Sequence, residues 1–316
     1  MTLCVAAQCM DNRRDKVAIA FEFSMESGIA TAEIEQRKLN WLGCEHFPVL
    51  MAGTHSHCRE LIGHIEYAWH ERAARIDFIA ACRQGIKQYK HTLANEYITA
   101  RLGISYDELL GKKRTSVPRD QYRELLTDIA RMKLGCDLLI IYFDPHESEL
   151  IRIEDTGTLE ICSNFAAIGS GMYIAESVFF HREHSRTETL AKTLYHVYEA
   201  MRLGGAHGPG VGTQFLMGVV QFSAPMGDAL WTFVEPEYFR LLEEEFKKFG
   251  PKKLGRQVIH REFLKKLYLL QSDRKRHTKK SKAPTGIGAR TNNSILTRSV
   301  ACKSIVTRRG DGKRKH

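Results

Sequence analysis

The sequence predicts an α+β fold in which two antiparallel sheets are packed between layers of helices. Two strand-like runs are apolar almost throughout, Val17 to Phe23 and Cys136 to Phe143, so both faces of each strand are expected to be buried. Stripes of apolar residues at helical spacing separate these runs, and tight turns between strands favour antiparallel pairing. A four-layer arrangement, with helices outside two stacked sheets, would bury both runs.

The elements are expected in the order strands, helices, strands, helices, strands. Strands are expected over Thr2 to Ala7, Val17 to Phe23, His46 to Gly53, Cys136 to Phe143, Leu150 to Ile153, Leu159 to Ala167, Thr213 to Phe222 and Leu230 to Val234. Helices are expected over Ser56 to Ala74, Ile76 to Leu102, Arg119 to Lys133, Gly171 to Phe180, Arg186 to Leu203 and Pro236 to Phe249. Turns or loops are expected at Met10 to Asp15, Gly103 to Pro118 and residues 204–212.

The 316 residues are expected to form one core domain over residues 1–250, with an insertion at about 98–131. Residues 251–272 carry one more helical stripe, and residues 273–316 have the composition of a basic, disordered tail. From Lys252 onward there are 20 lysines and arginines against three acidic residues, a net charge of +17, whereas the rest of the chain carries −7. The overall charge of +10 therefore comes from the residues that follow the core domain.

Cysteine usage and hydropathy predict a cytoplasmic protein with no membrane association. The eight cysteines include no C-x-x-C pair, which favours free thiols in a reducing compartment. No apolar run approaches the roughly 18 residues of a membrane helix, and the start of the chain has no basic leader before an apolar segment.

Thr2 is the first candidate for chemistry, because removal of Met1 is expected before a residue as small as threonine. The new chain end would carry a hydroxyl and a free α-amine on one residue. An α-amine has a pKa of about 7.7–8.0, so part of it is neutral at physiological pH and can act as general base for the hydroxyl. The alternative is that Met1-Thr2 is an ordinary chain start without a chemical role.

Glu22 and Lys38 form a second candidate pair. Glu22 interrupts an apolar strand, where an ionised carboxylate is costly unless a cation lies near it. Lys38 follows 16 residues later, a gap that allows a turn and a returning strand. A lysine held near the Thr2 hydroxyl would favour the alkoxide. The alternatives are a purely structural salt bridge, or a lysine on the surface.

These residues lie in blocks whose order resembles that of proteasome β-type subunits and of the simpler bacterial ATP-dependent protease ring, which are N-terminal-nucleophile (Ntn) hydrolases. The blocks are the strand from Thr2, the AIAFEFSMESGI segment with Glu22, the RKL segment with Lys38, the strand end Leu50-Met51-Ala52-Gly53, and the turn Ala166 to Gly171. They extend over most of residues 2–235. The resemblance implies the αββα sandwich of the Ntn hydrolase fold and a threonine-type peptide hydrolase.

Carried onto this sequence, the resemblance implies a role for each matched residue. Thr2 would be the nucleophile, Lys38 would assist formation of its alkoxide, and Glu22 would orient Lys38. The backbone N–H of Gly53 would stabilise the oxyanion, and Ser170 would hydrogen-bond near the α-amine. The alternatives are that Gly53 is a plain strand end and that Ser170 is a helix N-cap.

The resemblance also implies a substrate, a pocket and partners. Met25 and Met51 would line a pocket for an apolar side chain of a peptide or unfolded protein. The chain would assemble into a homo-oligomeric ring, an ATP-dependent unfoldase would feed it, and no cofactor would be needed. Amide hydrolysis of a small molecule is an alternative, because related enzymes use the same nucleophile.

Two departures from the family pattern favour a second hypothesis, a catalytically inactive Ntn-fold assembly subunit. The chain has extensions that the family pattern lacks, namely the insertion at about 98–131 and the basic tail. The segment Leu203 to Gly210 contains neither the Asp nor the Ser that proteasome β-subunits often place there.

A metal site and a nucleic-acid site are the remaining hypotheses. His55, His57 and Cys58, with His64 further on, are too few at helical spacing to indicate a metal, so no metal is expected and the start of a helix is favoured. The tail at residues 273–316 has the charge to bind nucleic acid or another polyanion. It has no interleaved aromatic residues for stacking on bases, which favours a solvated tail.

Overall fold

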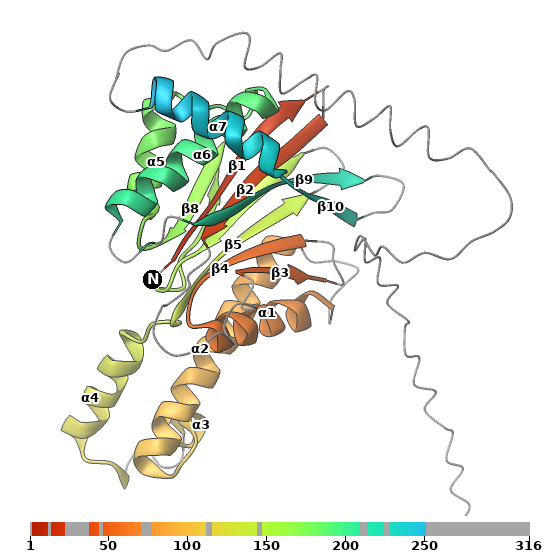
Figure 1. Cartoon of the computed structure of the whole chain (residues 1–316). Coiled ribbons are helices and arrows are strands. Elements are labelled where there is room, and N and C mark those ends of the chain that lie inside the picture. Colours follow the sequence, from red (N-terminus) through yellow and green to blue (C-terminus); the bar gives the residue numbers. More distant parts are fainter. Residues whose placement is uncertain are drawn as a thin grey trace, which may run out of the picture. The chain divides into compact units, whose positions relative to one another are not determined.

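The computed structural model shows an α+β fold with two antiparallel sheets of five strands each (Figure 1). It describes residues 2–250 apart from 12–13, 23–37, 44–46, 71–76, 112–115, 144–146, 209–210, 212–213 and 224–227. The chain divides into a unit Met1–Gln271 and a unit Ser272–His316. The second unit lies outside the described residues, and so does the helix expected at 251–272, so the predictions for both segments stay predictions.

The two sheets are built from ten strands of the described chain. Sheet A contains, in spatial order, β10 (Asp228–Phe233), β9 (Phe215–Ser223), β2 (Arg14–Glu22), β1 (Leu3–Asp11) and β8 (Phe165–Gly169). Sheet B contains β3 (Leu39–Leu42), β4 (Phe47–Gly53), β5 (Cys136–Phe143), β6 (Ser148–Ile153) and β7 (Leu159–Cys162). Every pairing between neighbouring strands is antiparallel.

Seven helices lie within the described residues, and most begin or end at residues that satisfy free backbone groups. They are α1 (His55–His70), α2 (Phe78–Leu102), α3 (Tyr106–Leu110), α4 (Arg119–Ala130), α5 (Met172–His181), α6 (Leu190–His207) and α7 (Pro236–Phe249). Asp77 caps α2 by accepting from the Ile79 N–H, and Thr189 caps α6 by accepting from the Lys192 N–H.

Three buried clusters define the order of the layers. One lies between α5, α6 and α7 and sheet A, the second between sheets A and B, and the third between sheet B and α1 and α2. Strand β1 serves two of them, because alternate side chains point to opposite faces: Leu3 and Val5 face the helices, whereas Cys4 and Ala6 face sheet B. This order of layers is compatible with the sandwich expected from the sequence (Figure 1).

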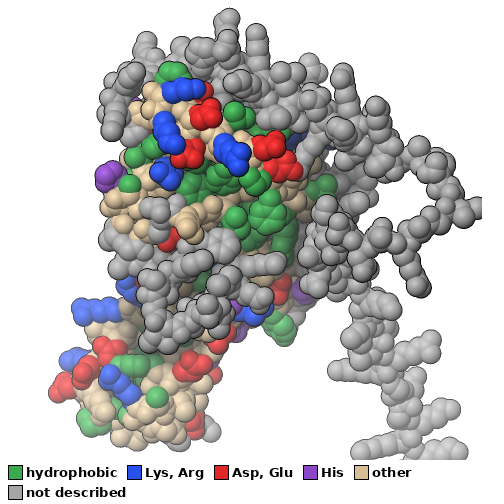
Figure 2. Space-filling model, viewed as in Figure 1, with side chains coloured by type: hydrophobic (Ala, Val, Ile, Leu, Met, Phe, Trp, Pro, Cys, Tyr) green, Lys and Arg blue, Asp and Glu red, His purple; other side chains and the backbone are tan. Residues whose placement is uncertain are grey.

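The expected insertion at 98–131 corresponds to a helical projection, made of the end of α2 with α3 and α4, that extends away from the sheets (Figure 1). It has a small core of its own around Ile98, Leu109 and Leu125. Basic and acidic side chains are interspersed on the face of the projection seen in Figure 2. The loop expected over Gly103 to Pro118 was wrong in part, since Ser105 forms a capping box with Glu108 and starts α3.

The single strand expected over Leu159 to Ala167 was wrong. It divides at Asn164, which has a φ of 71°, into β7 and β8. Strand β7 pairs with β6 in sheet B, whereas β8 pairs with β1 in sheet A. The left-handed conformation, which Asn tolerates better than most residues, turns the chain from one sheet to the other.

The glycine-rich turn expected from residue 204 was also placed too early, because α6 continues through Gly204 and Gly205 to His207. Gly204 packs against β1, and a Cβ built on it would lie 2.3 Å from Leu3 Cδ2. The glycine here is therefore explained by close packing of helix on sheet rather than by a turn. The turn expected at Met10 to Asp15 is shorter than predicted, because β1 continues to Asp11 and β2 begins at Arg14. Strand β3 was not expected from the sequence.

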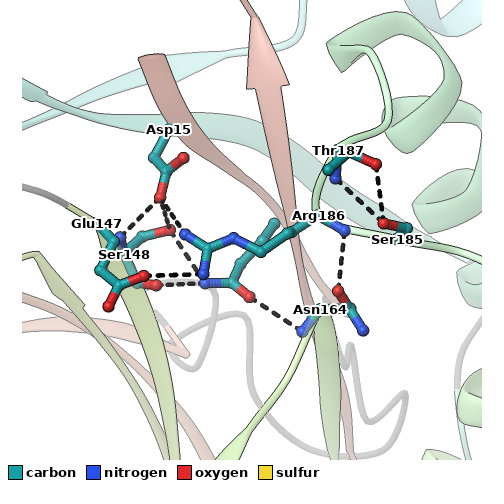
Figure 3. A network of polar contacts seen from close by, with 8 residues as sticks. Asp15, Glu147, Ser148, Asn164, Ser185, Arg186 and Thr187 are labelled. Carbon is teal, nitrogen blue, oxygen red and sulfur yellow. Dashed lines mark hydrogen bonds and ion pairs between the residues drawn. The ribbon is translucent and has the colours of Figure 1, made fainter. Parts of the chain in front are cut away.

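A polar network joins the two sheets near the end of β1 that lies away from Thr2 (Figure 3). Gln8 of β1 donates to the carbonyl and the hydroxyl of Ser148 in β6, and its Oε1 accepts from the Asn164 N–H at 3.0 Å. Asp15 of β2 accepts from the Ser148 N–H at 2.9 Å and from Arg186 at 2.7 Å. Since these partners lie far apart in the sequence, the network fixes the register of β1 relative to sheet B.

Two buried histidines adjoin this network. The Nδ1 atoms of His184 and His196 are 3.0 Å apart, and His184 Nε2 lies 3.0 Å from the Gln8 carbonyl oxygen. The carbonyl can only accept, so His184 donates from Nε2 and its Nδ1 accepts from His196. Burial lowers the pKa of His184, and burial lowers that of His196 further, with a contribution from its neighbour.

This histidine pair predicts a loss of stability at acid pH. The folded pKa values lie below the ordinary value of 6.5, so the unfolded chain binds more protons as the pH falls below 6.5. The free energy of unfolding should then fall by up to about 1.4 kcal/mol per pH unit for each histidine. Urea unfolding between pH 7.5 and 5.5 measures this slope. His196→Gln should reduce it and the exposed-site control His70→Gln should not; equal slopes in the two variants would contradict the assignment.

Candidate active site

The hydroxyl of Thr2 lies at the start of β1 and accepts a hydrogen bond from Lys38. Lys38 Nζ lies 2.8 Å from Thr2 Oγ1, and Glu22 Oε2 lies 3.9 Å from the same Nζ. Thr2 is 9% exposed, and the side chains of Lys38 and Glu22 are 18% and 1% exposed. The structure therefore brings together a hydroxyl, an ammonium and a carboxylate in a largely buried place.

Three strands position these side chains. The register of β1 and β2 pairs Cys4 with Phe21, so Glu22, the last residue of β2, lies beside the start of β1. Lys38 immediately precedes β3, and its carbonyl accepts from the Met51 N–H of β4 at 2.9 Å. The lysine is thus held by its main chain in sheet B while its side chain reaches Thr2 in sheet A.

Cys4 also faces this cluster, although nothing in the sequence pointed to it except that it shares a strand face with Thr2. Burial raises the pKa of the Cys4 thiol to about 12, against a lowering by the charge of Lys38 and with a smaller rise from Glu22. The thiol is therefore neutral at physiological pH. Because the thiol is uncharged, the charges beside the Thr2 hydroxyl described above are those of Lys38 and Glu22.

Glycine is required where the strand ends meet. Gly169, the last residue of β8, has a φ of 91° and pairs with Leu3, next to Thr2. A Cβ built on Gly169 would lie 2.1 Å from the Thr2 carbonyl oxygen and 3.4 Å from the Cβ of Ala52. The ends of β1, β4 and β8 can therefore approach one another only because residue 169 has no side chain.

Gly53 and Ser170 lie at the ends of two of these strands. Gly53 ends β4 with a φ of 96°, is exposed, and is packed so closely that a Cβ would lie 2.7 Å from the Gly135 carbonyl oxygen. Ser170 is exposed and follows Gly169 directly. The helix N-cap alternative for Ser170 was wrong, because the residue that caps α5 is Gly171.

The two methionines expected in a substrate pocket have different positions. Met51 is 4% exposed and belongs to the core between sheet B and the helices α1 and α2. Met25 lies outside the described residues. The pocket stays a prediction, and in the structure Met51 contributes packing.

His57 and Cys58, near the start of α1, have hydrogen-bond partners in the surrounding structure. His57 Nδ1 is hydrogen-bonded to the Tyr89 hydroxyl, and Cys58 Sγ donates to the Ala52 carbonyl at 3.6 Å. Within the part of the chain that is described, no group of three or more His, Cys, Asp or Glu residues is arranged to hold a metal ion. Within the same ranges, no helix combines the length and the hydropathy that a membrane span requires.

Comparison with known proteins adds no relative to this geometry, because no family model and no curated protein matches the chain.

The packing of Gly169 on Thr2 predicts a large effect of Gly169→Ala. The variant adds a Cβ at a positive φ and also forces it against the Thr2 carbonyl. Gly103→Ala is a matched control, since Gly103 has a φ of 67° but open space around its Cβ position. Urea unfolding should show Gly169→Ala to be less stable than the control by about 1–3 kcal/mol, the usual cost of overpacking. Equal losses would contradict the close approach of β8 to Thr2.

Proposed function

We propose that the chain is a threonine-type peptide hydrolase of the Ntn class, with Thr2 as the nucleophile after removal of Met1. The observation that carries the proposal is the 2.8 Å hydrogen bond from Lys38 Nζ to Thr2 Oγ1, with Glu22 behind the lysine. A structural lysine would need only its carboxylate partner. This one donates to a hydroxyl on the residue that becomes the chain end.

The direction of that hydrogen bond suits a nucleophile. Lys38 donates, so it uses a lone pair of Oγ1 and leaves the hydroxyl proton available to a base. The α-amine of a processed Thr2 belongs to the same residue and would accept this proton as Oγ1 attacks a peptide carbonyl carbon. The positive charge of Lys38 stabilises the negative charge that develops on Oγ1.

The remaining steps follow from the same groups. The carbonyl oxygen of the substrate becomes an oxyanion, for which the N–H of Gly53 is the proposed donor, and Ser170 is proposed to hydrogen-bond near the α-amine. When the tetrahedral intermediate collapses, the C–N bond breaks and the α-ammonium gives its proton to the leaving amine. Water, deprotonated by the α-amine, then hydrolyses the ester on Thr2 and restores the hydroxyl.

The wider features of the family are proposed on the resemblance alone. They are a homo-oligomeric ring, peptide or unfolded-protein substrates, an ATP-dependent unfoldase as partner, a cytoplasmic location and the Ntn version of the sandwich. The binding of a polyanion by residues 273–316 stays a prediction, because these residues are not described.

An inactive assembly subunit is the second candidate. It is favoured by the segment Leu203 to Gly210, which lacks both Asp and Ser and whose first part belongs to α6. The two candidates differ in one measurable property, hydrolysis that depends on Thr2.

The first prediction of this proposal concerns Thr2 and Lys38. Intact mass should show loss of Met1, a threonine-directed electrophile should label Thr2, and Thr2→Ala should abolish both labelling and cleavage of a fluorogenic peptide. Lys38→Met should lower kcat/KM by at least about 100-fold, because the positive charge that stabilises the developing alkoxide is lost.

Lys16→Met is the matched control for Lys38→Met. Lys16 pairs with Asp11 in sheet A at 2.7 Å, and its side chain is 16% exposed against 18% for Lys38. Each variant leaves a buried carboxylate without its cationic partner, but only Lys38→Met also removes the partner of Thr2. Lys16→Met should therefore keep kcat/KM within about threefold of wild type. A retained Met1, or equal losses in the two variants, would end the proposal.

The role of the α-amine predicts how the rate depends on pH. The amine acts as base only when it is neutral, so kcat/KM should rise with pH through an apparent pKa near the ordinary value of about 7.7–8.0. Peptide cleavage measured from pH 6 to 9 tests this. A rate that is flat over the range would exclude the amine as the base.

A further inference from the structure

The thiol of Cys4 is a buried group beside the candidate site for which the proposed reaction has no use. Cys4 is fully buried between the two sheets, and its Sγ donates to the Met51 carbonyl at 3.5 Å. The N–H of Met51 in turn donates to the Lys38 carbonyl at 2.9 Å. Met51 therefore connects Cys4 in β1 with Lys38, which enters β3.

These contacts close a loop around the site. Lys38 Nζ donates to Thr2 Oγ1, and Thr2 lies two residues before Cys4 on the same strand. The loop runs from Thr2 along β1 to Cys4, and from the Cys4 thiol to the carbonyl of Met51. It continues from the N–H of Met51 to the carbonyl of Lys38, and the Lys38 side chain returns to Thr2. Lys38 is thus fixed at both ends: at Nζ by Thr2 and at its carbonyl by Met51.

The chemistry of the thiol suits a donor. It is neutral at physiological pH, because burial raises its pKa to about 12, so it keeps the proton that it donates to Met51. A neutral group also adds no negative charge beside Lys38. A carboxylate or thiolate at this place would compete with Thr2 for the ammonium.

We propose that Cys4 is a positioning residue, whose thiol holds the end of β4 against β1 and so sets Lys38 at hydrogen-bonding distance from the Thr2 hydroxyl. The kinetic consequence rests on the proposed threonine hydrolase function. The placement of Lys38 does not, and it can be measured in a protein without activity.

The test compares Cys4→Ser, which keeps a donor, with Cys4→Ala, which removes it. Cys9 supplies matched controls, since it is a buried thiol of the same strand, 1% exposed, that has Thr193 as its hydrogen-bond partner. Two readouts are taken on the full-length chain: kcat and KM for a fluorogenic peptide, and the rate at which acetic anhydride acetylates Lys38, followed by mass spectrometry. Lys16 is the internal reference for acetylation, being 16% exposed and ion-paired.

The expected result has a specific pattern. Cys4→Ala should lower kcat about tenfold with KM little changed, in the range that small misplacements of catalytic groups produce, and should raise acetylation of Lys38 relative to Lys16 by about threefold or more. Cys4→Ser should restore both values to within about threefold of wild type. Cys9→Ala and Cys9→Ser should change neither.

Three outcomes overturn the inference. If Cys4→Ala matches Cys9→Ala in both readouts, the thiol does not position Lys38. If Lys38 acetylation rises in both alanine variants, or if kcat falls while acetylation does not change, the effect is general loosening or acts by another route. If the wild-type chain neither cleaves peptide nor labels at Thr2, the proposed function fails, and acetylation alone decides the positioning role.

Discussion

The rest of the structure depends on the burial of one ammonium group between a hydroxyl and a carboxylate. Lys38 carries its charge into a place where Thr2 and Glu22 are almost inaccessible to water. Burying either charge alone would cost several kcal/mol, so the lysine and the carboxylate require each other. They can meet only if the start of β1, the end of β2 and the segment before β3 converge, and the two sheets are stacked in the way that makes this possible.

Convergence of this kind requires close backbone approach, and two glycines provide it from opposite directions. Gly169 lets β8 lie against the Thr2 carbonyl, and Gly204 lets α6 lie against the side chain of Leu3. Thr2, which carries the hydroxyl, is therefore confined by β8, and its neighbour Leu3 is confined by α6. A nucleophile gains from such confinement, because each degree of freedom lost on folding need not be lost again in the transition state.

Features that arise from local sequence pattern could be predicted, whereas features that arise from contacts between distant segments could not. The apolar runs around Val17 and Cys136 predicted the two sheets, because strands buried on both faces have no polar alternation. The division at Asn164 could not be predicted, since the residues on either side are both strand-like and only the partner strands differ. The cost of a carboxylate in an apolar strand predicted a cation near Glu22. The position of Cys4 between the sheets and the packing of Met51 against α1 and α2 depend instead on tertiary contacts, which the local sequence pattern does not contain.

The two ends of β1 complement each other. Between them, the layer shared by the sheets combines the small side chains of Ala6, Ala52 and Ala166 with larger ones such as Ile19 and Leu139. Polar contacts join the two sheets at both ends of this layer, since Gln8 bonds to Ser148 at one end and Lys38 to Thr2 at the other. A slip of one residue would turn every side chain of β1 to the wrong face and separate both pairs at once. The polar network in Figure 3 therefore helps to keep Thr2 opposite Lys38, although the two lie at different ends of the strand.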